Sequence, residues 1–273
     1  MRNGMIYLLR LVFAVGGMLL LMYSLFGAAE PDYSMAAKVG VVLVIYVVRC
    51  ICARIQEKRY VRETNEQMYP EIIRDAFAGD PRKYARLMRA IERYNRDQIF
   101  RAQKMLCALL EECTTANEEF AVKFFMSACH DELEEYAEQM EILRELLDRE
   151  PDNALLWTNL GAALGNQGNL QEAVDACRMA INYEAENTEA YISLAMDYMR
   201  LDNPVEAKTA IGKALEYDPG RQQALQVAYG IAVLSEEPEA AEQYRKQYTM
   251  QGGIMDDLNR AVDFLAEKDQ AIE

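Results

Sequence analysis

The sequence predicts an all-α fold, in which an N-terminal transmembrane helical hairpin precedes an α-solenoid of about five helix pairs. The first observation is a pair of apolar runs before position 55. The first run is long enough to cross a bilayer, and the second run is long enough if the charged residues at its ends reach the headgroups. The second observation is a self-match at every 34th position in the C-terminal half. The third is the helical spacing of apolar residues between positions 69 and 150.

The first apolar run covers residues 5–29 and carries a single charge, Arg10. About 20 apolar residues cross a hydrocarbon core, and a long basic side chain near the end of a span reaches the headgroups. We therefore expect a membrane span here. A cleaved secretory signal is the alternative, because Arg2 precedes the run and small residues end it at 27–29.

The second apolar run is shorter. Residues 39–48 are uninterrupted, between Lys38 and Arg49, and the run extends to 35–53 if both charged side chains reach the headgroups. A buried strand of a soluble domain would have the same pattern. We favour a span because residues 50–53 continue the apolar character. The paired Cys50 and Cys52 either pack at the membrane boundary or accept an acyl chain.

Lys and Arg residues flank the hairpin asymmetrically. Five of them follow the second run between 49 and 62, whereas the loop between the runs offers only Lys38. Basic flanks stay on the cytoplasmic side. We therefore expect an integral membrane protein, of the plasma membrane, with its N-terminus and its repeats in the cytoplasm. If the second run does not cross, the repeats would be extracytoplasmic.

Charge is distributed unevenly along the chain. Residues 1–62 contain 8 Lys or Arg and 3 Asp or Glu, residues 63–104 contain 9 and 7, and residues 105–273 contain 12 and 34. The basic N-terminal part suits an anionic surface such as a lipid bilayer. The acidic remainder would repel a polyanion, so we expect no nucleic-acid partner.

Four columns of residues recur every 34 positions in the C-terminal half. They are Trp157, Tyr191 and Leu225; Leu160, Leu194 and Ala228; Ala173, Ala207 and Ala241; and Ala180, Ala214 and Tyr248. In the strongest unit, residues 154–165 and 170–183 have helical spacing, and residues 166–169 carry turn chemistry. A single helix pair cannot bury its apolar face alone, so the period predicts a stack of pairs.

The runs WTNLG at 157–161 and QGNLQEA at 167–173 resemble the signature of the tetratricopeptide repeat (TPR) family, and Pro219 stands where that family closes a repeat. The resemblance covers 154–221 well and weakens beyond, where residues 254–268 are expected to form a capping helix. We divide the chain into a two-span membrane anchor (1–54), a basic juxtamembrane linker (55–68), degenerate helical repeats (69–153), TPR-like repeats (154–253), and a C-terminal capping helix and tail (254–273).

The resemblance also implies a partner-binding groove, because this family binds protein or peptide partners in a concave groove lined by the first helix of each pair. The residues at such positions are Leu155, Thr158, Asn159, Ala162, Asn166, Glu189, Ile192, Ser193, Met196 and Met199. A partly apolar groove suits an extended or helical segment with hydrophobic anchors. The alternative is that Met196 and Met199 only pack between helices.

An arginine stripe precedes the repeats. It consists of Arg82, Arg86, Arg89, Arg93 and Arg96, which follow helical spacing and share an arc of about 80°. Three interpretations stay open: a solvated helix face, contact with anionic lipid headgroups, or contact with an acidic partner.

No catalytic motif is present, since the sequence has no phosphate-binding glycine loop, no GxSxG and a single histidine, His130. The six cysteines show no CxxC spacing, so we expect neither a metal nor a cofactor, and no enzyme. The sequence predicts a membrane-anchored scaffold or adaptor that presents a cytoplasmic protein-binding groove. The alternatives are a regulatory peptide sensor and an assembly factor of a membrane complex that acts partly through its spans.

Overall fold

The computed structural model describes residues 76–77 and 79–266. The chain divides into two units, residues 1–68 and 69–273, and the described residues belong to the second. The predicted spans and the basic linker lie outside the described residues. Within the described part, every helix is too short or too polar to cross a membrane.

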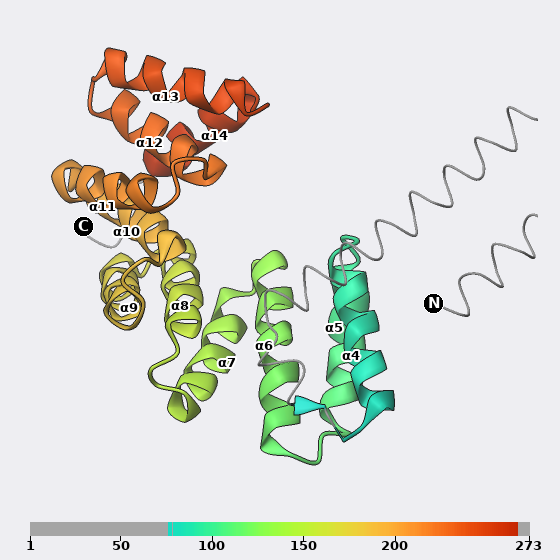
Figure 1. Ribbon diagram of the computed structural model, residues 1–273. Helices are drawn as coiled ribbons and strands as arrows, with labels where there is room; N and C mark the ends of the chain where they lie inside the picture. Colours follow the sequence, from blue (N-terminus) through green and yellow to red (C-terminus); the bar gives the residue numbers. More distant parts are fainter. Residues whose placement is uncertain (1–75, 78, 267–273) are drawn as a thin grey trace, which may run out of the picture. The chain divides into compact units, whose positions relative to one another are not determined.

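The described part contains eleven helices, which confirms the prediction of an all-α repeat fold. They are α4 (Pro81–Tyr94), α5 (Ile99–Leu110), α6 (Ala116–Glu132), α7 (Tyr136–Arg149), α8 (Ala154–Gln167), α9 (Leu170–Tyr183), α10 (Thr188–Arg200), α11 (Pro204–Tyr217), α12 (Gln222–Leu234), α13 (Pro238–Met250) and α14 (Met255–Ala266). Ten of them form five successive pairs, and α14 follows the last pair (Figure 1).

The turn inside each pair has one backbone design. A residue with positive φ ends the first helix, and the N–H of the following residue donates to the carbonyl five positions back, as Asn169 does to Leu164 at 2.9 Å. The positive-φ residues are Asp97, Glu134, Gly168, Asp202 and Glu236. The last four recur at every 34th position, so the period recognised in the sequence is a period of backbone turns.

Helix starts recur as well. Asn153 and Asn187 cap α8 and α10, each accepting from the backbone N–H three residues later, at 3.3 and 2.9 Å. At the start of α6, Thr115 and Glu118 form a reciprocal capping box. Pro204 and Pro238 open α11 and α13, where no N–H is required. Local sequence therefore sets the helix boundaries.

Small residues let the paired helices approach closely. A Cβ at Gly161 on α8 would lie 2.6 Å from the sulfur of Cys177 on α9, so only glycine fits there. Around this contact Leu160 and Ala173 are buried. The packed core continues in this way along the stack, with each pair covering the apolar side of the next.

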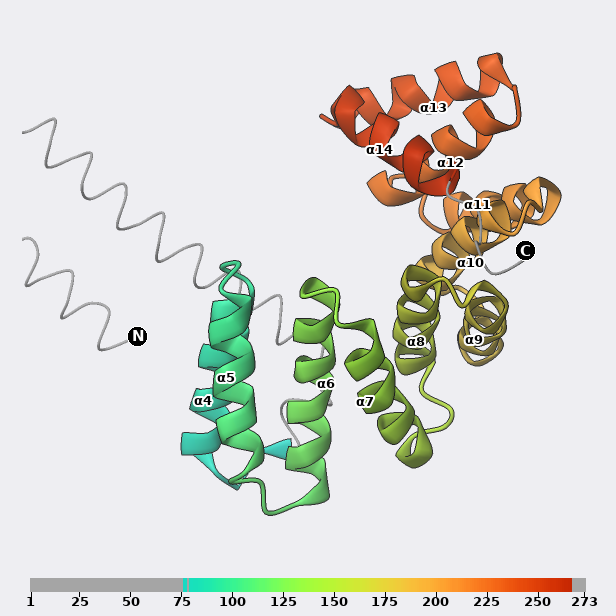
Figure 2. The same cartoon turned by 180° about the vertical axis from the view of Figure 1, so that it is seen from behind.

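The last helix departs from the repeat geometry. The first helices α6, α10 and α12 each pack on both helices of the pair before them, as α10 does on α9 and α8. By contrast, α14 packs mainly along α12 and also contacts α10 (Figure 2). It lies within residues 254–268, where a capping helix was expected, and it buries Leu258 and Leu265.

Candidate protein-binding face

The first helices of three pairs, α8, α10 and α12, repeat their surface positions with the same period of 34. We define the first-helix face by four columns of equivalent residues on these helices. The columns are Leu155, Glu189 and Gln223; Asn159, Ser193 and Val227; Ala162, Met196 and Gly230; and Asn166, Arg200 and Leu234. Adjacent first helices contact each other, so each column continues from one repeat to the next.

Seven of the ten residues predicted to line a groove keep exposed surface. They are Leu155, Asn159, Ala162, Asn166, Glu189, Ser193 and Met196. Four come from α8 and three from α10, and all belong to the four columns. The structure thus brings them onto one strip of two adjacent helices, with polar and apolar side chains interleaved.

The other three predicted residues are buried, which corrects their assignment to an open surface. Ile192 is fully buried, and Thr158 and Met199 expose 6% and 9% of their surface. The Thr158 hydroxyl donates to the carbonyl of Ala154 at 2.9 Å and accepts from the Asn187 amide at 3.1 Å. Each first helix is flanked by neighbours on both sides, so its exposed arc is narrower than the sequence pattern suggested.

A buried carboxyl lies beneath the face. Asp197 on α10 is 3% exposed, and within the described part of the chain its Oδ2 atom has no hydrogen-bond partner. Burial raises the pKa of this carboxyl to about 7, against the opposing effect of the Arg200 guanidinium. Sequence reasoning missed Asp197, although its column otherwise holds the buried residues Ala163 and Ile231. A charged residue in a column of otherwise apolar residues is the sequence signal that could have identified Asp197.

The α12 part of the first-helix face is covered by α14. A Cβ at Gly230 would lie 2.7 Å from a methyl carbon of Leu265, so the two helices touch at this glycine. The Arg200 guanidinium carbon lies 5.1 Å from the ring centroid of Phe264, within cation–π range. Beside this contact a cavity of about 310 Å³ remains, with Met196 in its lining.

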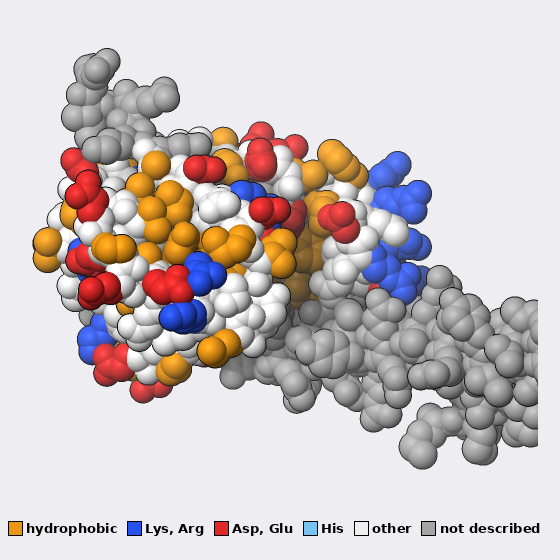
Figure 3. Space-filling view, turned by 90° about the horizontal axis from the view of Figure 1, so that it is seen from above, with side chains coloured by type: hydrophobic (Ala, Val, Ile, Leu, Met, Phe, Trp, Pro, Cys, Tyr) orange, Lys and Arg blue, Asp and Glu red, His pale blue; other side chains and the backbone are white. Residues whose placement is uncertain are grey.

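The arginine stripe lies on α4. Its members Arg82, Arg89 and Arg96 are exposed, and Arg86 and Arg93 are half-buried. Figure 3 shows basic side chains gathered at the end of the unit where α4 lies. The opposite side of the helix packs into the core through Tyr84, Leu87, Met88, Ile91 and Tyr94.

Three stripe residues contact side chains of the same chain. The contacts are Arg86 with Glu112, Arg93 with Gln98, and Arg96 with Glu92. Among the described residues, Arg82 and Arg89 have no such contact. These two are therefore the stripe residues most available to an external anion.

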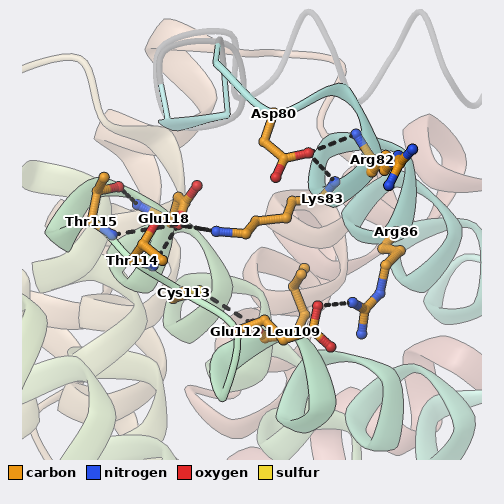
Figure 4. Close-up of polar contacts among 10 residues, drawn as sticks. All are labelled: Asp80, Arg82, Lys83, Arg86, Leu109, Glu112, Cys113, Thr114, Thr115 and Glu118. Carbon is orange, nitrogen blue, oxygen red and sulfur yellow. Dashed lines mark hydrogen bonds and ion pairs between the residues drawn. The ribbon is translucent and has the colours of Figure 1, made fainter.

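A partly buried ion pair ties α4 to the start of α6 (Figure 4). The Lys83 ammonium lies 2.9 Å from the Glu118 carboxylate, which also accepts from the backbone N–H of Thr114 at 2.7 Å. Although burial alone would raise the pKa of Glu118, the Thr114 N–H and the Lys83 ammonium hold it below its ordinary value. Lys83 is thus turned inward and does not extend the arginine stripe.

The described residues contain no cluster of three or more His, Cys, Asp or Glu side chains placed to hold a metal ion. What the described surface offers is the mixed polar and apolar first-helix face and the stripe of α4.

Comparisons with known proteins support the repeat assignment. A family model described as "Tetratricopeptide repeat" matches residues 142–175. Stress-induced-phosphoprotein 1 of Caenorhabditis elegans is 28% identical over 110 residues, which are 40% of this chain and 34% of that protein. The match therefore spans about a third of the length of this curated relative.

Solved structures share the fold at low identity. A thermophilic TPR protein of Thermus thermophilus aligns over 67% of this chain and 98% of its own, with a TM-score of 0.58 and 13% identity. PilW, described as a type IV pilus biogenesis factor, aligns over 69% and 88%, with a TM-score of 0.58 and 16% identity. MamA aligns over 60% and 94%, with a TM-score of 0.50 and 17% identity. At these identities the likeness shows a TPR-like solenoid.

Proposed function

We propose that this chain is a membrane-anchored scaffold or adaptor, which presents the first-helix face of its repeats to a protein partner in the cytoplasm. The TPR fold, supported by the family model and by the solved structures, generally serves protein interaction. The sequence adds two predicted membrane spans before the repeats.

The observation that carries the proposal is the pairing of exposed positions on consecutive helices. Asn159 on α8 and Ser193 on α10 are equivalent and both partly exposed, and so are Ala162 and Met196. These four positions carry amide, hydroxyl and aliphatic groups, and Glu189 adds a carboxylate to the same strip. Such a mixture suits a protein segment that brings both apolar anchors and hydrogen-bonding groups.

Anchoring the chain in the membrane would raise its apparent affinity for a partner without any new contact. A tethered binding face searches for its partner in two dimensions and at a raised effective concentration. The orientation is tested by protease protection on sealed vesicles: digestion of residues 69–273 from the cytoplasmic side alone is expected. Digestion from the opposite side alone would contradict the proposed topology.

Site-specific photo-crosslinking in intact membranes tests the binding face. A crosslinker at Asn159 or Ser193 is expected to capture the same partner protein, because the two positions lie on one strip. A crosslinker at Gly212, an open surface position on α11, is the matched control and should not capture it. Equal capture from all three positions would sink the proposal, since it would show no preference for the first-helix face.

A further inference from the structure

The part of the first-helix face on α12 is occupied by α14. The contacts of α14 there suggest what kind of partner the rest of the face accepts. On α12 the four columns are held by Gln223, Val227, Gly230 and Leu234, the equivalents of exposed positions on α8 and α10. Two of these, Gln223 and Val227, line the cavity beside α14, and Gly230 touches α14 directly. A helix of the chain itself therefore lies on a partner-binding position of the third repeat.

The contacts of α14 are those of an amphipathic helix in a groove. Ala261, Phe264 and Leu265 face the repeats, with the Ala261 carbonyl oxygen 3.5 Å from where a Cβ of Gly230 would lie. Phe264 reaches past α12 to Arg200 of α10. The outer side of α14 is exposed, through Asp256, Asn259, Arg260 and Asp263. A small residue followed by an aromatic residue and a leucine, three and four positions later, thus fits this face.

The cavity of about 310 Å³ beside α14 is open to the surface. It is lined by Met196 and Val227 of the repeats and by Phe264 and Leu265 of α14. The turn before α14 contains Gly252, with a φ of 88°, and Gly253, and exposes Ile254. This turn joins α13 to α14, and the Tyr248 hydroxyl of α13 donates to Asp257 of α14 at 2.9 Å.

Resting on the proposed function, we infer that the α10–α12 part of the first-helix face is a binding site for an amphipathic helix. In the free protein α14 fills this site as an internal ligand, and a partner helix with the same small–aromatic–leucine pattern displaces it. An intramolecular helix competes at an effective concentration on the order of millimolar. Partners would bind tightly only when α14 is released.

Titration of a labelled synthetic peptide, residues 254–266, into the full chain tests this inference. The variant Leu265→Asp places a charge in the contact with Gly230 and releases α14, whereas Asp263→Ala changes only its exposed side. The peptide is expected to bind the Leu265→Asp chain at least about tenfold more tightly than the unmodified or the Asp263→Ala chain. A peptide carrying Leu265→Asp should bind none of them.

Equal affinities across the three chains, or no binding to a folded Leu265→Asp chain, would overturn the inference. Because this variant could lose its fold, hydrogen exchange of the unmodified chain gives a second test. The α14 amides should exchange through a local opening, faster than those of α12, and equal protection of the two helices would also overturn it. Asn159 lies on α8, outside the α10–α12 part of the face, so the crosslink from Asn159 distinguishes failure of this inference from failure of the proposed function.

Discussion

Replacing Asp197 with Asn should stabilise the protein most at alkaline pH. The carboxyl of Asp197 is 3% exposed, and burial raises its pKa to about 7, whereas the unfolded chain releases this proton near the ordinary value of 3.8. Between these values the native state binds more protons than the unfolded state. The free energy of unfolding therefore falls as the pH rises from about 4 to about 7, and the contribution is constant above that.

The magnitude follows from the size of this pKa difference. A difference of about 3 pKa units corresponds to about 4 kcal/mol of lost stability, of which about 2 kcal/mol falls between pH 5.5 and 8. An Asn at position 197 keeps the shape of the side chain and carries no charge. The stability advantage of the Asp197→Asn variant should accordingly grow by about 2 kcal/mol from pH 5.5 to pH 8.

Urea denaturation followed by far-UV circular dichroism, at several pH values across this window, measures the difference. The full chain is used, in mild detergent because of its two predicted spans. Asp148→Asn, at an exposed position on α7, is the matched control and should run parallel to the unmodified chain. If Asp197→Asn also runs parallel, then the carboxyl is ionised in the native state and the reasoning from burial is wrong.

Three further perturbations follow from the turns, the partly buried ion pair and the arginine stripe. Glu236→Gly should stabilise the chain by about 1 kcal/mol in urea denaturation. Glu236 has a φ of 57°, a left-handed conformation that is unfavourable for a residue with a Cβ. A loss of stability would contradict this account of the turn. Glu118→Gln should destabilise it by about 1–2 kcal/mol at neutral pH through weakened charge-assisted hydrogen bonds. That deficit should shrink at acid pH, where the lowered pKa of Glu118 is passed and the unmodified carboxylate is protonated too, so a deficit independent of pH would refute the role of its charge. Changing Arg82 and Arg89 to Glu should weaken binding of the 69–273 unit to anionic lipid vesicles at least about tenfold in a sedimentation assay, whereas Lys213→Glu should not. Unchanged binding of the double variant would leave the stripe as a solvated face.

The helix pairs could be predicted because their turns and their core obey the same period. The recurrence of Trp157, Tyr191 and Leu225 at every 34th position indicates how the helices pack, and Gly168 indicates the turn within a pair. The backbone then repeats the turn at Asp202 with a residue that has a Cβ. Stacking supplies enough stabilisation to hold such a residue in the left-handed region, so the period survives where the glycine signal is lost.

The groove prediction was less accurate because a period assigns equivalent positions but not their exposure. Thr158 and Ile192 are equivalent, and both are buried. Exposure depends on how closely the neighbouring helices approach, and that depends on small residues elsewhere, such as Gly161 and Gly165. Likewise, the apolar face of α14 indicated a capping helix, but its position on α12 requires Gly230, which the pattern alone does not single out.

The two helix pairs before α8 show how far the 34-residue period can be used to identify equivalent positions. Glu134 stands one period before Gly168 and makes the same turn, so the pair α6–α7 is a true repeat despite lacking the sequence signature. Asp97 makes this turn as well, yet it stands more than one period before Glu134, mainly because α6 has 17 residues where α8 has 14. The columns of the first-helix face therefore cannot be extended to α4 by counting. Binding positions on α4 must be found from exposure, and the exposed pair Arg82 and Arg89 belongs to a surface with its own chemistry.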